Sequence, residues 1–210
     1  MQTTIRTTLV RVLTGVLVGL ALSNASNAQS VETLAPEPHF PGDSVYQLNA
    51  TLTDQNGHAF KLRDHMGKPV LISMFYSTCK FVCPMLIDTM EITRQGLTQQ
   101  EQAQLALLLI TFDPDRDDVK KLKSIATSRE LANSQWTLAR TDAGNSRKIA
   151  ATLGIQYRLL SDGDFNHTTV LLLLDGAGRI VGRTKKMGTA DPAFIQQVKQ
   201  TILASHHVGS

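Results

Sequence analysis

Residues Val70–Pro84, with the sequence VLISMFYSTCKFVCP, join a continuous apolar run to a pair of cysteines and a proline. The apolar part, residues 70–76, lacks the polar alternation of a half-exposed strand and is typical of a strand buried on both faces of a sheet. Pro84 suits the first turn of a helix, because its missing N–H has no helical partner there in any case. We therefore predict a buried strand, a cysteine-bearing loop and then a helix over about residues 84–96.

The two cysteines of this stretch, Cys79 and Cys83, are the only ones in the 210-residue chain. Side chains at positions i and i+4 of a helix lie about 5–6 Å apart. That separation suits a disulfide, and it equally suits two thiolates that bind one soft metal ion. A helix N-terminus favours thiolate, the form that attacks disulfides and binds Cu(I). A bridge across three residues adds little stability, so the pair predicts a redox-active or metal-binding dithiol.

The rest of the chain alternates predicted strands with predicted helices. Strands are expected at residues 45–52, 59–62, 105–112, 136–139, 168–174 and 179–183, and helices at residues 117–131, 143–153 and 190–204. The sequence Asp-Gln-Asn-Gly at residues 54–57 predicts the turn of an N-terminal hairpin. This order predicts an α/β fold, namely a thioredoxin-like sandwich with a mixed sheet and an added N-terminal β-hairpin.

Residues 1–28 have the pattern of an export signal. Arg6 and Arg11 give the segment a basic start. A short apolar stretch from Val12 to Leu22 follows, and small residues continue as far as Ala28. The stretch is short for a membrane helix, which needs about 20 residues. We expect cleavage after Ala28, with an uncleaved membrane anchor as the alternative. Export would place the dithiol in an oxidising, periplasmic space.

Composition predicts one ordinary domain and excludes some partners. Residues 29–44 contain three prolines and are expected to be a linker, residues 45–205 the domain, and residues 206–210 a tail. The chain has 21 Lys and Arg residues against 18 Asp and Glu residues. Such a small net charge predicts no nucleic-acid partner, and membrane contact only if residues 1–28 are retained.

His167 is the third candidate residue of the dithiol site. It immediately precedes the strand predicted at residues 168–174, and in a thioredoxin-like sheet the loop that enters this strand lies against the cysteine loop. A lone histidine at the start of a strand is otherwise usually a surface residue. Two thiolates and one imidazole suit Cu(I), and the sequence offers no obvious fourth ligand for a structural zinc ion.

The other histidines and acids give weaker signals. Four acids follow the strand predicted at residues 105–112, namely Asp113, Asp115, Asp117 and Asp118. They lack the glycine and distal glutamate of a calcium loop, and we interpret them as a turn followed by helix-start acids. Three histidines occur in linker or hairpin contexts and are expected to be solvated, namely His39, His58 and His65. The pair His206-His207 is expected on the tail.

Three segments together resemble the SCO/SenC family: YSTCKFVCP at residues 76–84, ITFDPDRD at residues 110–117, and Asn166-His167 before an apolar strand. The resemblance spans about residues 40–205 and keeps the order of the motifs. It implies an exported thioredoxin-like domain that binds copper through the two cysteines and the histidine. It also implies delivery of that copper to the dinuclear copper site of cytochrome c oxidase subunit II. Other members of the family are implied to act as thiol–disulfide oxidoreductases that reduce the cysteines of their target.

Two functions follow from these observations. The first is a Cu(I) chaperone for cytochrome c oxidase subunit II or another cuproenzyme, with Cys79, Cys83 and His167 as ligands. Lys80-Phe81 stand where the family commonly has Pro-Asp, and the added positive charge disfavours Cu(II) more than Cu(I). The second function is a periplasmic thiol–disulfide oxidoreductase, coupled to a thiol reductant, in which Cys79 attacks and Cys83 resolves. A peroxidase on the same fold fits less well, because such enzymes place the peroxidatic residue in a different local setting.

Overall fold

The computed structural model describes residues 40–79, 82–131 and 135–206, and the strand β3 (Val70–Phe75) lies within its core. All six residues of β3 are buried, as the apolar run predicts. The polar side chain of Ser73 is satisfied, because its hydroxyl donates a hydrogen bond to the carbonyl of Val170 at 2.6 Å. The predicted signal segment, His39, Lys80-Phe81 and His207 lie outside the described residues.

Within the described residues, β3 belongs to a seven-stranded mixed sheet with the order β2-β1-β5-β4-β3-β8-β9. Its other strands are β1 (Thr51–Asp54), β2 (Ala59–Lys61), β4 (Ala106–Thr111), β5 (Trp136–Arg140), β8 (Leu171–Leu174) and β9 (Ile180–Thr184). Strands β3, β4 and β5 are parallel, whereas β8 is antiparallel to β3 and β9 is antiparallel to β8. On the opposite side of β4, strand β1 pairs antiparallel with both β5 and β2. The predicted α/β class with a mixed sheet is confirmed.

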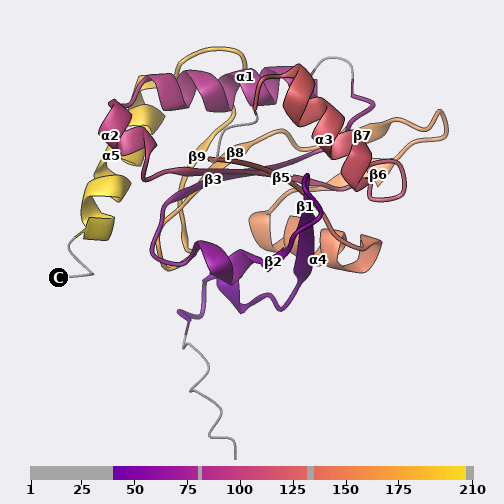
Figure 1. The fold of residues 1–210 in the computed structure, drawn as a ribbon, viewed down its shortest axis with the longest axis horizontal. Helices are drawn as coiled ribbons and strands as arrows, with labels where there is room; N and C mark the ends of the chain where they lie inside the picture. Colours follow the sequence, from indigo (N-terminus) through magenta and orange to yellow (C-terminus); the bar gives the residue numbers. More distant parts are fainter. Residues whose placement is uncertain (1–39, 80–81, 132–134, 207–210) are drawn as a thin grey trace, which may run out of the picture. The chain divides into compact units, whose positions relative to one another are not determined.

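Helices cover both faces of this sheet (Figure 1). The helices are α1 (Val82–Gln95), α2 (Gln99–Gln102), α3 (Val119–Ser128), α4 (Ala143–Leu153) and α5 (Pro192–His206). Helices α1 and α3 lie on one face and α4 on the other, and α5 packs against α1 and β9. None of the helices in the described ranges combines the length and the apolar character that a membrane crossing requires.

Side-chain caps determine where two of these helices begin. The carboxylate of Asp118 accepts a hydrogen bond from the N–H of Lys121 at 2.7 Å, so α3 begins two residues later than predicted. Asp142 caps α4 in the same way by accepting from the N–H of Asn145 at 2.9 Å. Gly154 ends α4 in the left-handed conformation that glycine adopts readily.

The strand predicted at residues 45–52 is wrong in its first half. Residues Val45–Gln47 form the short 3-10 helix η1, and β1 begins only at Thr51. The hydroxyl of Ser44 accepts a hydrogen bond from the N–H of Tyr46, and the Tyr46 ring is buried beside Gly178. The apolar residues of this segment are therefore buried by the packing of a 3-10 turn and not by a strand.

A second hairpin, which no sequence pattern predicted, is formed by β6 (Tyr157–Leu159) and β7 (Phe165–His167). Its strands have three residues each, too few for a clear periodicity. Gly163 lies in the connecting turn at a φ of +84°, which glycine adopts without steric cost. His167 therefore lies in β7 and not in the loop expected before β8. Strand β8 begins at Leu171 instead of residue 168.

The sheet interior predicts a strong dependence of stability on packing at β8. Leu172 is fully buried, so we expect Leu172→Ala to lower the free energy of unfolding by about 2–5 kcal/mol. Leu203 of α5 is 57 % exposed, and the matched variant Leu203→Ala should change stability by no more than about 0.5 kcal/mol. Urea denaturation measures both, and equal losses in the two variants would contradict the burial of Leu172 in the sheet.

Candidate metal centre

Strand directions bring the two ligand-bearing segments to one edge of the sheet. The Cys loop follows the carboxyl end of β3, and His167 precedes the amino end of β8. Because β8 is antiparallel to β3, these two ends are neighbours. The sulfur atoms of Cys79 and Cys83 and an imidazole nitrogen of His167 all lie within 4.8 Å of one another. The structure thus brings together the three residues that the sequence predicted as one site.

The two cysteines do not share a helix face as predicted. Helix α1 begins at Val82, so Cys83 lies in its first turn and Cys79 precedes it. The backbone N–H of Cys83 donates a hydrogen bond to the sulfur of Cys79 at 3.3 Å. An N–H group at the start of a helix stabilises a negative charge, so this contact favours the thiolate form of Cys79.

Cys83 differs from its partner in exposure. Cys79 is half-buried, whereas Cys83 is only 5 % exposed. Burial is the main cause that raises the pKa of the Cys83 thiol, and the nearby Cys79 raises it further. The prediction that the helix start lowers thiol pKa values is therefore wrong for Cys83, because desolvation outweighs the field of the helix. Cys83 is a neutral thiol at neutral pH.

His167 is oriented by its backbone neighbours and by two aromatic rings. It pairs with Tyr157 across the β6–β7 hairpin. Its Nδ1 lies 3.3 Å from the carbonyl oxygen of Thr168, which can only accept, so the tautomer with the proton on Nδ1 satisfies this contact. The lone pair then resides on Nε2 and is available to a metal ion. The imidazole meets the ring of Tyr76 edge-on at 5.6 Å and lies 5.2 Å from the ring of Phe112.

Tyr76 is a site residue that no sequence pattern predicted. Its hydroxyl donates a short hydrogen bond to Asp164 on the β6–β7 hairpin, and this contact lowers the pKa of Asp164. Burial, followed by the same contact, raises the pKa of Tyr76 well above its ordinary value. The two residues are 88 positions apart, and no spacing signal in the sequence relates them. Their bond ties the end of β3 to the hairpin that carries His167.

The acidic cluster after β4 is only partly what the sequence predicted. Asp118 is a helix cap, as expected for a helix-start acid. Asp117 is instead fully buried, and it accepts hydrogen bonds from the N–H of Ser77 at 3.0 Å and from the hydroxyl of Thr111. Asp113 forms an ion pair with Arg116, although burial still raises its pKa. Asp113, Asp118 and the Oδ2 atom of Asp117 accept from donors of the protein, whereas the buried Oδ1 atom of Asp117 has no hydrogen-bond partner among the described residues.

The histidines outside the site differ from one another. His58 has a side chain that is 78 % exposed, as expected, and its Nδ1 lies 3.3 Å from Asp54. The prediction of a solvated His65 is wrong, because this residue lies in the 3-10 helix η2 (Leu62–His65) with its ring edge-on to Phe60 at 5.8 Å. Burial lowers the pKa of His65.

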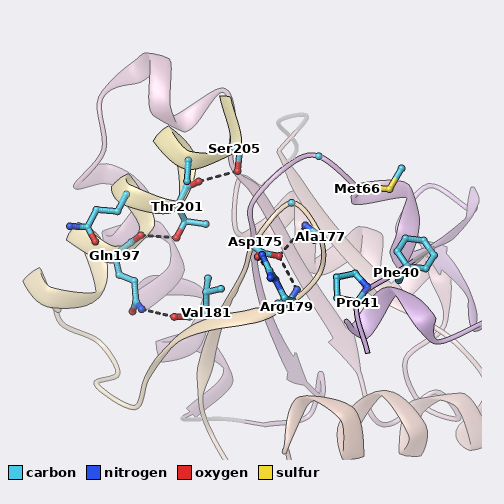
Figure 2. Close-up of a pocket in the computed structure, with 14 residues that line it drawn as sticks. Phe40, Pro41, Met66, Asp175, Ala177, Arg179, Val181, Gln197, Thr201 and Ser205 are labelled. Atoms are coloured by element: carbon cyan, nitrogen blue, oxygen red, sulfur yellow. Dashed lines mark hydrogen bonds and ion pairs between the residues drawn. The ribbon is translucent and has the colours of Figure 1, made fainter. Parts of the chain in front are cut away.

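A cavity of about 590 Å³ lies at the other end of β3 and does not include the site (Figure 2). Its walls come from residues 40–41, residues 66–67, the β8–β9 turn and the second half of α5. Asp175, at the start of the turn, accepts hydrogen bonds from the N–H of Ala177 at 3.0 Å and from Arg179 at 2.8 Å (Figure 2). These contacts order the turn, and none of the three candidate ligands lines the cavity.

Known proteins with a similar sequence or fold identify the family of this chain. A family model described as SCO1/SenC matches residues 43–203. The chain belongs to the SCO1/SenC family. Its fold is similar to that of Bradyrhizobium japonicum ScoI with copper bound, at 25% identity and a TM-score of 0.59 over 72% of this chain and 96% of that one.

Two further relatives extend this comparison. BsSco, described as a member of the Sco family of cytochrome c oxidase assembly proteins with a disulfide switch, has a TM-score of 0.61 at 20% identity over 72% of this chain and 90% of that one. A "Putative copper-binding protein" from Stutzerimonas stutzeri is 32% identical over 73 residues. That match covers 35% of this chain and only 36% of the relative.

The difference between the two thiols predicts an order of chemical modification. At pH 7 iodoacetamide should alkylate Cys79 first, because Cys79 is half-buried and accepts an N–H bond that favours its thiolate. Cys83 should react slowly, since it is buried and its pKa is raised. Its rate should increase with pH, because only the deprotonated form reacts. Peptide mapping by mass spectrometry after timed quenching measures both rates, and faster labelling of Cys83 would overturn this assignment.

Proposed function

We propose that this chain binds Cu(I) through Cys79, Cys83 and His167 and delivers it to a cuproenzyme such as cytochrome c oxidase subunit II. The observation that carries the proposal is the convergence of two sulfur atoms and one imidazole nitrogen within 4.8 Å. Membership of the SCO1/SenC family supports it, and so does the similarity to a ScoI structure with copper bound. Copper is in this role the cargo of the protein and not a resident cofactor.

The donor set fits Cu(I) better than other common metal ions. Thiolate sulfur and imidazole nitrogen are soft or borderline ligands, which favour Cu(I) over Ca²⁺ or Mg²⁺. A structural zinc ion requires four protein ligands. Among the residues that the structure describes, no fourth Cys, His, Asp or Glu side chain joins the group. The site therefore supports binding of a three-coordinate soft ion.

Exposure of the site suits transfer better than permanent storage. Cys79 and His167 are each half-buried, so an acceptor can reach them, whereas Cys83 is covered. We infer that thiols of the acceptor replace Cys79 and His167 before Cys83 releases the ion. Binding also displaces the proton that Cys83 carries at neutral pH, so the affinity for Cu(I) should increase with pH.

The acceptor and the compartment belong to this proposal. BsSco is described as a cytochrome c oxidase assembly protein, and we extend that role to this chain. The export pattern of residues 1–28 supports a periplasmic location, with an anchored form if that segment is retained. In an oxidising compartment a thiol reductant is needed to keep the empty dithiol ready for Cu(I).

An anaerobic Cu(I) titration of the reduced protein against a competing chelator tests the three-ligand site. We expect one Cu(I) per chain, and we expect His167→Ala to weaken binding by about tenfold or more, equivalent to about 1.4 kcal/mol. The control is His58→Ala, which removes an exposed histidine at the N-terminal hairpin and should leave the affinity unchanged. Unchanged affinity in His167→Ala would exclude His167 as a ligand.

The asymmetry of the two cysteines supports thiol–disulfide exchange as a second candidate function. The thiolate of Cys79 would attack a partner disulfide, form a mixed disulfide and release one partner thiolate. Cys83, after loss of its proton, would attack the sulfur of Cys79 and release the second partner thiol. The partner is then reduced by two electrons and the pair becomes a Cys79–Cys83 disulfide. An external thiol reductant would restore the dithiol.

Oxidised glutathione provides a test of this second candidate. Cys83→Ser should accumulate a glutathione adduct on Cys79, because the resolving thiol is missing, while Cys79→Ser should form an adduct slowly. The reduction potential of the wild-type pair should lie above about −300 mV, the range of exchangeable rather than structural disulfides. Mass spectrometry measures the formation of the adducts, and equilibration with glutathione buffers measures the reduction potential. A lower potential, or rapid adduct formation on Cys83, would argue against exchange.

A further inference from the structure

The turn between β4 and α3, residues 113–117, contacts both ligand-bearing segments of the proposed copper site. It is held internally by the N–H of Asp117, which donates to the carbonyl of Asp113 at 3.0 Å. Arg140 of β5 binds the turn by donating hydrogen bonds to the carbonyl of Asp117 at 3.0 Å and to that of Pro114 at 2.8 Å. The turn is therefore a rigid part of the sheet edge and suits a positioning role.

One side of this turn holds the cysteine loop. The buried carboxylate of Asp117 accepts the N–H of Ser77, two residues before Cys79. The same oxygen accepts the hydroxyl of Thr111 at the end of β4. Asp117 thereby fixes the point at which the chain leaves β3 toward the dithiol.

The adjacent residue, Arg116, holds the histidine hairpin. Its Nη1 donates to the carbonyl of Gly163 at 2.7 Å, in the turn between β6 and β7. Its guanidinium also lies 5.3 Å from the centre of the Phe165 ring, two residues before His167, and forms an ion pair with Asp113. A planar guanidinium can make these three contacts at once because its donors point in fixed, different directions.

We propose that Arg116 is a positioning residue that acts on the metal site through His167, whereas Asp117 acts through the cysteine loop. This inference rests on the proposed Cu(I) site. Two adjacent residues of one rigid turn thus set the position of the imidazole relative to the two sulfurs. Partners that hydrogen-bond a metal ligand directly typically change metal affinity by about 10–100-fold when they are replaced. Arg116 reaches His167 only through Gly163 and Phe165, so its effect should lie at the low end of that range.

A double-mutant cycle with His167→Ala separates the two routes. Arg116→Gln should weaken Cu(I) binding by about tenfold in the wild-type background, and by no more than His167→Ala does. In the His167→Ala background the same change should alter the affinity by less than about twofold. A change of that size is within the usual scatter of double-mutant measurements and counts as no effect. Asp117→Asn is the matched comparison, and its effect should remain in both backgrounds. Arg158→Gln, at an exposed arginine of the same hairpin, should have no effect in either background.

X-ray absorption at the copper edge gives a readout that a general loss of stability would not mimic. Bound Cu(I) should have two sulfur ligands and one nitrogen ligand in the wild-type protein and in Arg158→Gln. In Arg116→Gln the nitrogen contribution should decrease, as in His167→Ala, while both sulfurs remain. If Arg116→Gln does not fold, Arg116→Lys tests the same contacts, because it keeps the positive charge beside Asp113 and removes the planar guanidinium that reaches Gly163 and Phe165.

The outcomes distinguish this inference from the proposed function. An Arg116→Gln effect that persists in the His167→Ala background, or an unchanged nitrogen contribution, overturns the positioning role and leaves the three-ligand site intact. If His167→Ala itself does not weaken Cu(I) binding, the proposed site is wrong and the inference is wrong with it. An Arg116→Gln effect that disappears in the His167→Ala background, together with loss of the nitrogen ligand, supports the assignment.

Discussion

The pairing of β3 with β4 on one side and β8 on the other is the constraint on which the site depends. Parallel β4 places the turn at residues 113–117 at the same edge of the sheet as the cysteine loop. Antiparallel β8 brings its amino end, and with it the β6–β7 hairpin, to that edge as well. Three loops that are far apart in the sequence therefore meet at one edge, where ligands commonly bind in α/β sheets.

Burial gives the two thiols different properties within this arrangement. Cys83 lies inside the edge of the core, where desolvation opposes its ionisation. Cys79 precedes helix α1, and its sulfur accepts a hydrogen bond from the N–H of Cys83. A dithiol with one accessible sulfur and one protected thiol suits both stepwise metal transfer and stepwise disulfide exchange. The imidazole of His167 favours the metal-binding role, because disulfide exchange needs only the two sulfurs.

Sequence patterns predicted the long elements well and the short ones poorly. The buried strand β3 and the long helices carry enough residues for their periodicity or apolar character to be recognised. The β6–β7 hairpin, with three residues in each strand, gives no such signal, and η1 has an alternating pattern that equally fits a strand. In both places tertiary contacts, such as the bond between Tyr76 and Asp164, determine the local structure.

The sequence by itself determined the chemistry of the candidate site, because Cys79, Cys83 and His167 carry soft or borderline donors whatever their surroundings. It also determined the α/β class through the order of its strands and helices. Only the tertiary structure decided which thiol is buried and which nitrogen of His167 lies beside the carbonyl of Thr168. It alone shows the contacts of Arg116 and Asp117, whose partners are 47 and 40 residues away. Such contacts depend on how distant segments pack, and burial, pKa and ligand orientation follow from that packing.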